Sequence, residues 1–221
     1  MSFHRAAGIS GILFGVLLLV GLLVGGSPPA ADASAAKIVQ YVADHEGALK
    51  LAAGAASLGG LFAIIWIVGA FERLRAGDDT ARSWALVAIV GVVLTGGLAA
   101  ATNGVTAVLV AGGRGLGDGT VLALWKTTWV DTAFLGAFLG VALLGFGLAG
   151  LRAGVGAKWL NYLVLVGAAA SIVGAAAPTE VAGGSPLGFA VFLAYLIFIL
   201  FVVVSSIEML RAPEAPSGSA G

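Results

Sequence analysis

The amino-acid sequence predicts an all-α integral membrane protein that folds as one bundle of six transmembrane helices. The composition is the first reason, because 60% of the 221 residues are hydrophobic and 10% are charged, whereas soluble domains carry about 25% charged residues. The second is that six apolar runs approach or exceed the roughly 20 residues that cross a bilayer. The third is that the connecting segments are short, so we expect a single domain over residues 1–211.

The predicted helices are apolar runs bounded by charged residues, glycine or proline. They cover residues 8–25, 51–71, 84–110, 132–151, 159–177 and 186–207, and the fourth has an apolar extension back to residue 121. The first run shares features with a signal peptide. It is longer than the usual apolar region of roughly 7–15 residues, which favours a retained helix. The Pro-, Ser- and Gly-rich residues 212–221 predict a disordered cytoplasmic tail.

The distribution of lysine and arginine predicts the orientation. With the N-terminus inside, the cytoplasmic segments carry Arg5, Arg73, Arg75, Arg82, Arg152, Lys158 and Arg211, and the outer segments carry Lys37, Lys50, Arg114 and Lys126. The positive-inside rule therefore places both termini in the cytoplasm. The chain then forms three hairpins, each running outward and back.

Arginine and tryptophan residues at the ends of the runs are predicted interface anchors. The three returning helices all end in Leu-Arg-Ala, where the arginine can bind the last carbonyl groups and meets the negative end of the helix dipole. This short repeat is typical of interface chemistry, and an internal duplication is the alternative. Tryptophan is enriched at the level of the lipid head groups. The predicted anchors are Arg75, Trp84, Trp125, Trp129, Arg152, Trp159 and Arg211.

The longest loop, residues 27–50, is predicted to contain a short amphipathic helix near 34–46. Ser34 or Asp32 can cap its N-terminus and Gly47 can end it. Its apolar positions fall on one face; they are Ala35, Ile38, Val39 and Val42. We expect this helix to lie on the outer leaflet or over the mouth of the bundle.

Two charged residues, Lys126 and Asp131, lie inside the otherwise apolar stretch ALWKTTWVDTAF. The 20 residues of the run 132–151 already give roughly 30 Å of helix, enough to cross the hydrocarbon core. Asp131 is therefore predicted at the outer boundary, with Lys126 beyond it. This count favours interfacial anchoring over a charge pair buried in the membrane.

Asn103 lies about one membrane thickness after Trp84, so it reaches the same outer level as Asp131. If the third and fourth helices form a hairpin, polar groups on one helix face polar groups on the other. The groups concerned are Thr102, Asn103 and Thr106 on one side and Thr127, Thr128 and Asp131 on the other. They predict either an interhelical hydrogen-bond cluster, worth about 0.6 kcal/mol per contact, or an outer-facing pocket. The candidate ligand-binding residues are Asn103, Thr106, Thr128 and Asp131.

Other kinds of site find little support in the sequence. No charged residue or histidine is predicted near mid-bilayer, where ion-coupled carriers usually keep one. Asp44, His45 and Glu46 are consecutive, so on a helix they point about 100° apart and do not converge on a metal. No catalytic motif is found, and neither a cofactor nor a metal is expected. A net charge of zero argues against nucleic-acid binding.

These observations favour a non-enzymatic accessory or assembly protein, with the lipid bilayer as its surroundings. A membrane-protein partner or a second copy would pack on glycine-rich helix faces such as that of Gly136 and Gly140. The alternative is a carrier or sensor of a neutral or amphiphilic ligand that uses the outer polar pocket. A membrane enzyme is the third hypothesis, and it lacks a convergent acid–base set.

The chain resembles a group of uncharacterised actinobacterial membrane proteins. The features that carry the resemblance are the outer segment DASAAKIVQYVADHEG, the helix end FERLRAG and the helix start AKWLNYL. Together they extend over most of the chain. Relatives often have proline where this chain has Lys158. The resemblance implies six helices in a bacterial inner membrane and no established activity, and it supplies no catalytic residues.

Overall fold

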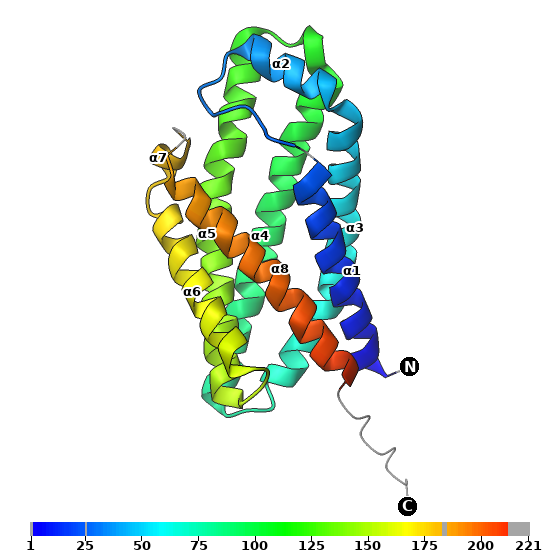
Figure 1. The fold of residues 1–221 in the computed structure, drawn as a ribbon, viewed down its shortest axis with the longest axis vertical. Helices are drawn as coiled ribbons and strands as arrows, with labels where there is room; N and C mark the ends of the chain where they lie inside the picture. Colours follow the sequence, from blue (N-terminus) through cyan, green and yellow to red (C-terminus); the bar gives the residue numbers. More distant parts are fainter. Residues whose placement is uncertain (1, 25, 183–184, 212–221) are drawn as a thin grey trace, which may run out of the picture.

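The computed structural model describes residues 2–24, 26–182 and 185–211, and within them the chain is helical with no strand. The helices are α1 (Phe3–Val24), α2 (Ala35–Asp44), α3 (Glu46–Leu74), α4 (Asp79–Gly112), α5 (Asp118–Ala153), α6 (Lys158–Ala175), α7 (Pro178–Ala182) and α8 (Leu187–Arg211), with a single 3₁₀ turn, η1 (Gly113–Gly115), between α4 and α5. Six of these helices are long and apolar enough to cross a membrane (Figure 1). The six-helix membrane fold predicted from the sequence is therefore confirmed. The predicted tail, 212–221, lies outside the described residues.

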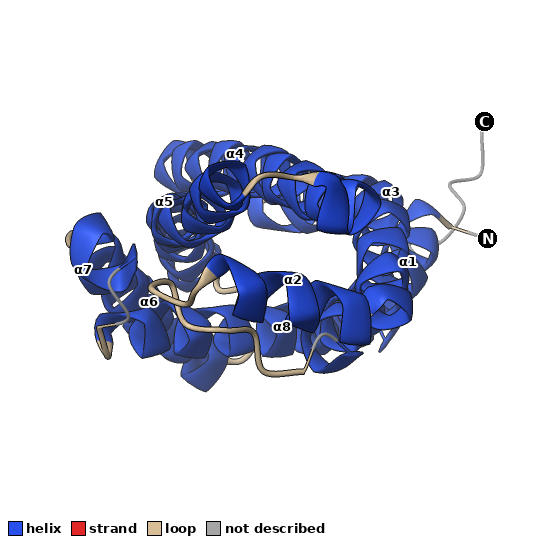
Figure 2. Cartoon of the chain, turned by 90° about the horizontal axis from the view of Figure 1, so that it is seen from above, coloured by secondary structure: helices blue, strands red, loops and turns tan. Residues whose placement is uncertain are grey.

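The six long helices form three antiparallel hairpins arranged in a ring. α1 packs on α3, α4 on α5, and α6 on α8, as the sequence predicts. Contacts between α3 and α4, α5 and α6, and α8 and α1 close the ring, which Figure 2 shows from above. The N-terminus and the end of α8 lie at the same end of the bundle (Figure 1).

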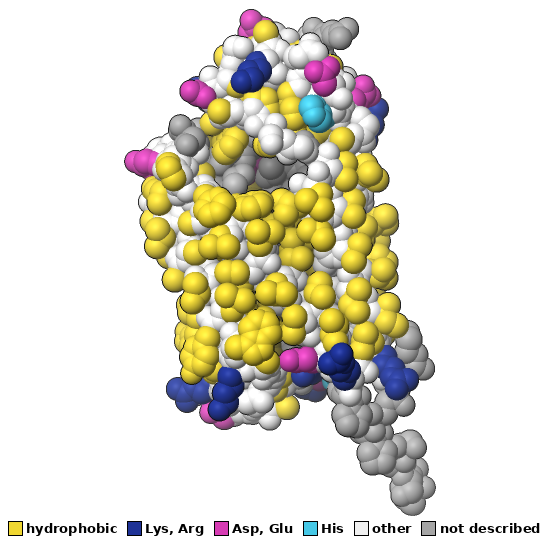
Figure 3. All heavy atoms as spheres, viewed as in Figure 1, with side chains coloured by type: hydrophobic (Ala, Val, Ile, Leu, Met, Phe, Trp, Pro, Cys, Tyr) yellow, Lys and Arg dark blue, Asp and Glu magenta, His cyan; other side chains and the backbone are white. Residues whose placement is uncertain are grey.

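Charged side chains gather at the two ends of the molecule, and a belt of apolar side chains separates them (Figure 3). The end that holds the chain termini carries most of the lysine and arginine visible on this face. The positive-inside rule predicts that this end faces the cytoplasm, so we call it the inner end. The opposite end, where α2 lies, is called the outer end.

α4 and α5 are longer than a membrane crossing requires. Their 34 and 36 residues give helices of about 50 Å, against a hydrocarbon core of about 30 Å. We therefore expect their outer ends to rise past the membrane. α2 lies across these ends (Figure 1). Contact between these elements buries a group of side chains that we call the outer cluster: Ala35, Ile38 and Val42 of α2, Leu109 of α4, and Val121 and Trp125 of α5.

The predicted outer helix is present, with one correction at its C-terminal end. Ser34 caps α2, and its hydroxyl oxygen accepts a hydrogen bond from the Lys37 N–H at 3.4 Å. Gly47 does not end the helix. The chain turns at His45 and α3 begins at Glu46, so Gly47 lies inside the next helix. His45 ends α2 instead, because its backbone leaves helical geometry (φ −113°, ψ 17°) while its N–H still bonds to the Tyr41 carbonyl.

The inner half of the bundle holds a dense apolar core around Trp66, which we call the inner cluster. Trp66 is fully buried, and the ring centroids of four phenylalanines lie 5.7–6.2 Å from it. These rings come from α1, α5 and α8; they are Phe14, Phe146, Phe198 and Phe201. The inner cluster fills the centre of the ring in the inner half of the bundle.

Glycines let α1 approach α8 closely at the inner end. A Cβ atom on Gly11 would lie 2.0 Å from Ser206 Oγ and 2.2 Å from Trp66 Cδ1, so only glycine fits there. Gly11 and Gly15, which form a GxxxG pair, thus pack within the bundle, where small residues at this spacing let helices approach closely. α1 is therefore packed into the core of the bundle.

Candidate functional site

The outer halves of α4 and α5 meet through polar side chains. The Thr102 hydroxyl donates to Asp131 Oδ2 at 3.1 Å, which joins the two helices at the level that the residue count predicts. Four further side chains, which carry a hydroxyl or an amide group, lie within two turns of this contact. We call the whole set the polar layer: Thr102, Asn103 and Thr106 of α4, and Thr128, Asp131 and Thr132 of α5.

Asn103 lies on the face of α4 that points into the ring. It comes eleven residues after Val92, which packs against the inner cluster, and seven before Val110, which packs against the outer cluster. Each of these spacings brings two side chains to within about 20° of each other around a helix. Asn103 therefore lies on the interior face, between the two clusters.

The same spacing places two threonines of α5 on its interior face. Thr128 comes seven residues after Val121 in the outer cluster and eleven before Leu139 in the inner cluster. Thr132 comes seven residues after Trp125 and seven before Leu139. The interior faces of α4 and α5 are thus apolar at both ends and polar between them.

The polar layer is accessible although it lies inside the ring. α4 has no buried residue between Gly91 and Leu109, and α5 has none between Trp125 and Ala133. In the inner half, by contrast, many residues of α5 are buried. Figure 3 shows the corresponding hollow in the surface, between α2 and the apolar belt.

The hollow opens to the side because α8 crosses the bundle obliquely. In its outer half α8 packs on α6, where Gly174 comes close to Val191. In its inner half it packs on α1, through Gly8, Gly11 and Gly15. The outer ends of α1 and α8 therefore diverge, and the interior faces of α4 and α5 lie behind the gap between them (Figure 1).

α2 forms the roof of the hollow, and aromatic side chains hold it against α5. The Trp125 indole N–H donates to the Ala30 carbonyl at 3.2 Å, which ties α5 to the segment before α2. The Trp125 ring meets the Tyr41 ring edge-on, with centroids 6.0 Å apart. Burial in this contact raises the pKa of the Tyr41 phenol above its ordinary value. His45 stacks on Tyr41 at 4.6 Å and reaches its carbonyl oxygen through Nδ1 at 3.0 Å.

The structure corrects the predicted anchor role of Trp125. Its side chain is only 6% exposed, because α2 covers it, so it cannot insert among lipid head groups. Trp129 is half-buried against the same outer cluster. Trp84 is also half-buried, against the inner cluster.

The remaining predicted anchors are exposed near the inner end of the bundle. Trp159 is 57% exposed at the start of α6. Arg75, Arg152 and Arg211 lie at or next to the ends of α3, α5 and α8. These positions are those that an interface anchor needs.

Lys126 and Asp131 do not form an ion pair in the described part of the chain. Lys126 is exposed, and the carboxylate of Asp131 is instead bonded to Thr102. Thr127 is exposed as well and does not belong to the interior face. Thr132 was not among the candidates from the sequence; its spacing of four from Thr128 is the signal that identifies it.

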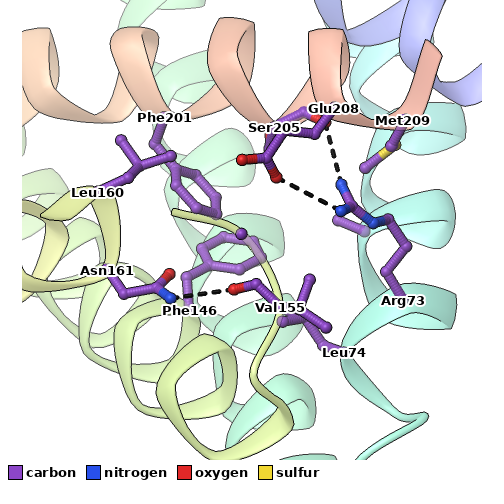
Figure 4. Close-up of a pocket in the computed structure, with 12 residues that line it drawn as sticks. Arg73, Leu74, Phe146, Val155, Leu160, Asn161, Phe201, Ser205, Glu208 and Met209 are labelled. Carbon is purple, nitrogen blue, oxygen red and sulfur yellow. Dashed lines mark hydrogen bonds and ion pairs between the residues drawn. The ribbon is translucent and has the colours of Figure 1, made fainter. Parts of the chain in front are cut away.

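A second polar site, not predicted from the sequence, lies at the inner end (Figure 4). Arg73 of α3 forms an ion pair with Glu208 of α8 at 3.4 Å and donates to the Ser205 carbonyl at 3.3 Å. The other carboxylate oxygen of Glu208 accepts from the Ala157 N–H at 3.2 Å. The two charged side chains are 20% and 27% exposed. This arrangement, which we call the inner latch, ties α3, α8 and the α5–α6 connection together.

The cavity beside the inner latch is small. Its volume is about 30 Å³, and it lies between Arg73, Glu208, Asn161 and the rings of Phe146 and Phe201. Such a volume suits one or two ordered waters and excludes an organic ligand. The side-chain amide of Asn161 donates a hydrogen bond to the Val155 carbonyl at 3.0 Å, so this residue holds the shape of the α5–α6 connection. The inner site is therefore structural, and the outer hollow is the better candidate for a ligand.

No group of three or more His, Asp or Glu side chains suited to a metal ion occurs among the described residues. Comparisons with protein-family models, with curated proteins and with solved structures found no match. The resemblance to the actinobacterial group stays a prediction. Function is therefore argued from the geometry of this chain alone.

Proposed function

We propose that the protein binds an amphiphilic ligand that enters the outer hollow sideways from the outer leaflet of a bacterial inner membrane. The observation that carries the proposal is the accessible polar layer, which is roofed by α2 and lies behind the gap between α1 and α8. The residue count places this layer at the expected membrane boundary. A polar pocket open only upward would suit a water-soluble ligand. A side opening at this depth suits a molecule that already resides in the bilayer.

The depth of the polar layer matches the head-group region. Asp131 lies 21 residues before Arg152, which gives about 32 Å along the helix and spans the hydrocarbon core. Deeper on the interior face of α4, Ala99 and Gly96 offer little bulk. The head group of the ligand therefore lies at the polar layer, and its apolar chain extends toward the inner cluster.

The side chains of the polar layer support the binding of a ligand rather than the catalysis of a reaction. Asp131 is the single acidic residue of the polar layer, and its contact there is a threonine hydroxyl rather than a basic group. A general acid–base mechanism needs a second titratable group within reach. We therefore assign the protein a carrier or sensor role.

The accessory role depends on small-residue faces that are free to meet a partner. Gly136 packs against Val191 of α8, and Gly140 packs against Ile172 of α6. These two glycines are thus used within the chain, so they lend the accessory role no support.

A pair of neighbouring glycines provides a matched test of ligand binding. Gly96 lies seven residues before Asn103 on the interior face of α4, and Gly97 lies about 100° away, on the face of the exposed Val90 and Val93. A Cβ atom meets nothing within 4 Å at either glycine. Gly96→Phe fills the hollow, whereas Gly97→Phe adds the same ring on the lipid side.

Both variants are extracted from native membranes in polymer-bounded lipid discs, and retained lipids are identified by mass spectrometry after exchange into discs of phosphatidylcholine. The parent chain and Gly97→Phe are expected to retain one lipid species well above its bulk share, and Gly96→Phe is expected to lose it. Equal retention by the two variants, or no enriched species on the parent chain, contradicts the proposal.

A further inference from the structure

We infer that the outer hollow selects amphiphiles whose head group donates hydrogen bonds and carries no negative charge, such as hydroxyls or a primary ammonium. This inference rests on the proposed function and specifies its ligand. It follows from the hydrogen-bond donors of the polar layer, most of which are already used within the protein, and from its acceptors, most of which remain open.

Each threonine hydroxyl of the polar layer already donates its hydrogen to another group of the protein. Each hydroxyl carries a single hydrogen and can accept through its lone pairs. Thr106 donates to the Thr102 carbonyl at 3.1 Å, Thr128 to the Trp125 carbonyl at 2.7 Å, and Thr132 to the Thr128 carbonyl at 2.8 Å. Toward the hollow these side chains therefore present oxygen acceptors.

Thr102 and Asp131 add further acceptor capacity. Thr102 shares its hydrogen between the Leu98 carbonyl at 3.0 Å and Asp131 Oδ2 at 3.1 Å. A carboxylate only accepts, and one hydrogen bond leaves most of its lone-pair sites open. Asn103, which makes no side-chain hydrogen bond among the described residues, contributes the one amide NH₂ of the layer. Acceptors thus outnumber donors.

None of the three outer lysines, whose side chains the structure describes, offsets the Asp131 carboxylate. Lys126 is five residues away, about 140° around the helix from Asp131, and is exposed. Lys50 is paired with Glu46 at the start of α3. Lys37 lies on the exposed side of α2.

The chemistry of the head group follows from this imbalance. Hydroxyl or ammonium groups supply the hydrogens that the threonine oxygens and the carboxylate accept. A phosphate or carboxylate brings more acceptors and a like charge, so it leaves polar groups unpaired in a site partly shielded from water. A trimethylammonium group carries positive charge but no hydrogen to donate, which makes it a useful probe.

Competition among amphiphiles with one chain and different head groups tests the inference. The protein is placed in phosphatidylcholine discs after Trp84→Phe and Trp159→Phe, which leave Trp66, Trp125 and Trp129 as fluorophores. The probe is a glycerol monoester with a dibrominated acyl chain, which quenches tryptophan on contact. Competitors are dodecylglycerol, dodecylamine, dodecyltrimethylammonium and dodecyl phosphate, each compared at its mole fraction in the disc.

We expect the quenching to be saturable. Dodecylglycerol and dodecylamine should reverse it at mole fractions at least about tenfold lower than the other two competitors require. If all four compete equally, ligand binding stands and the head-group inference fails. The inference also fails if trimethylammonium matches the primary amine, because charge alone then decides. If quenching never saturates, the proposed function itself fails.

Two variants locate the selectivity on the polar layer. Asp131→Asn replaces acceptor oxygens by an amide that also donates, so the preference for dodecylamine over dodecyl phosphate should fall by about tenfold. Thr127→Val removes a neighbouring hydroxyl that is exposed and bonded only to the Ala123 carbonyl, so it should leave all four competitors unchanged. An unchanged preference in Asp131→Asn overturns the assignment.

Discussion

Gly11→Ala tests whether the close approach of α1 to α8 holds the inner end of the bundle shut. The added Cβ atom would lie 2.0 Å from Ser206 Oγ and 2.2 Å from Trp66 Cδ1, far inside van der Waals contact. Neither neighbour can yield cheaply, because Ser206 and Trp66 are both fully buried. Overpacking of this kind costs about 1–3 kcal/mol, and the gain in helix propensity from glycine to alanine offsets about 0.5–1 kcal/mol of it.

We therefore expect Gly11→Ala to lower the free energy of unfolding by about 1–2 kcal/mol. Gly21→Ala is the matched control on the same helix, since the nearest atom to its Cβ is the Ala52 carbonyl oxygen at 3.9 Å. It should be neutral or slightly stabilising. The assay is thermal unfolding in lipid discs, followed by tryptophan fluorescence. Unchanged or raised stability in Gly11→Ala, or equal losses in both variants, would refute the packing argument.

Two further predictions concern the latch and the roof. Glu208→Gln should destabilise the protein by about 1–3 kcal/mol in thermal unfolding, because the inner latch is largely buried. The control Glu46→Gln, in the exposed pair with Lys50, should have a much smaller effect; equal effects would contradict the burial argument. Trp125→Phe keeps the packing of the roof but loses its hydrogen bond to the preceding segment, so amide hydrogen exchange in residues 26–34 should quicken without a change in α8. Unaltered exchange in 26–34 would show that the indole N–H does not hold the roof.

The membrane fold and the meeting of Thr102 with Asp131 could be predicted because they depend on local information. Apolar run lengths define the six helices, and counting residues inward from Asp131 places it at the outer boundary. The hydrogen bond to Thr102 then follows from pairing α4 with α5 as a hairpin. These steps need only helix rise and chain order.

Features that join distant parts of the chain could not be predicted in the same way. Arg73 and Glu208 are 135 residues apart, and no local pattern connects them. The sequence predicts Trp125 in the head-group belt, because a tryptophan near the membrane boundary is typical of that belt. Only the docking of α2 shows that this side chain is covered instead. The hollow likewise depends on the oblique path of α8, which residue spacing within one helix does not specify.

The two ends of the bundle differ in a way that bears on how a ligand can use it. At the outer end the polar layer is accessible from the side, under a roof held by the indole of Trp125. Toward the inner end the ring is filled by Trp66 and its surrounding rings and fastened by the pair Arg73 and Glu208. Passage to the inner end would require both to open, with a charge pair broken and the aromatic core parted. Binding from the outer leaflet requires neither change. The geometry therefore supports a sensor or receptor of outer-leaflet amphiphiles more directly than a carrier that releases its ligand at the inner end.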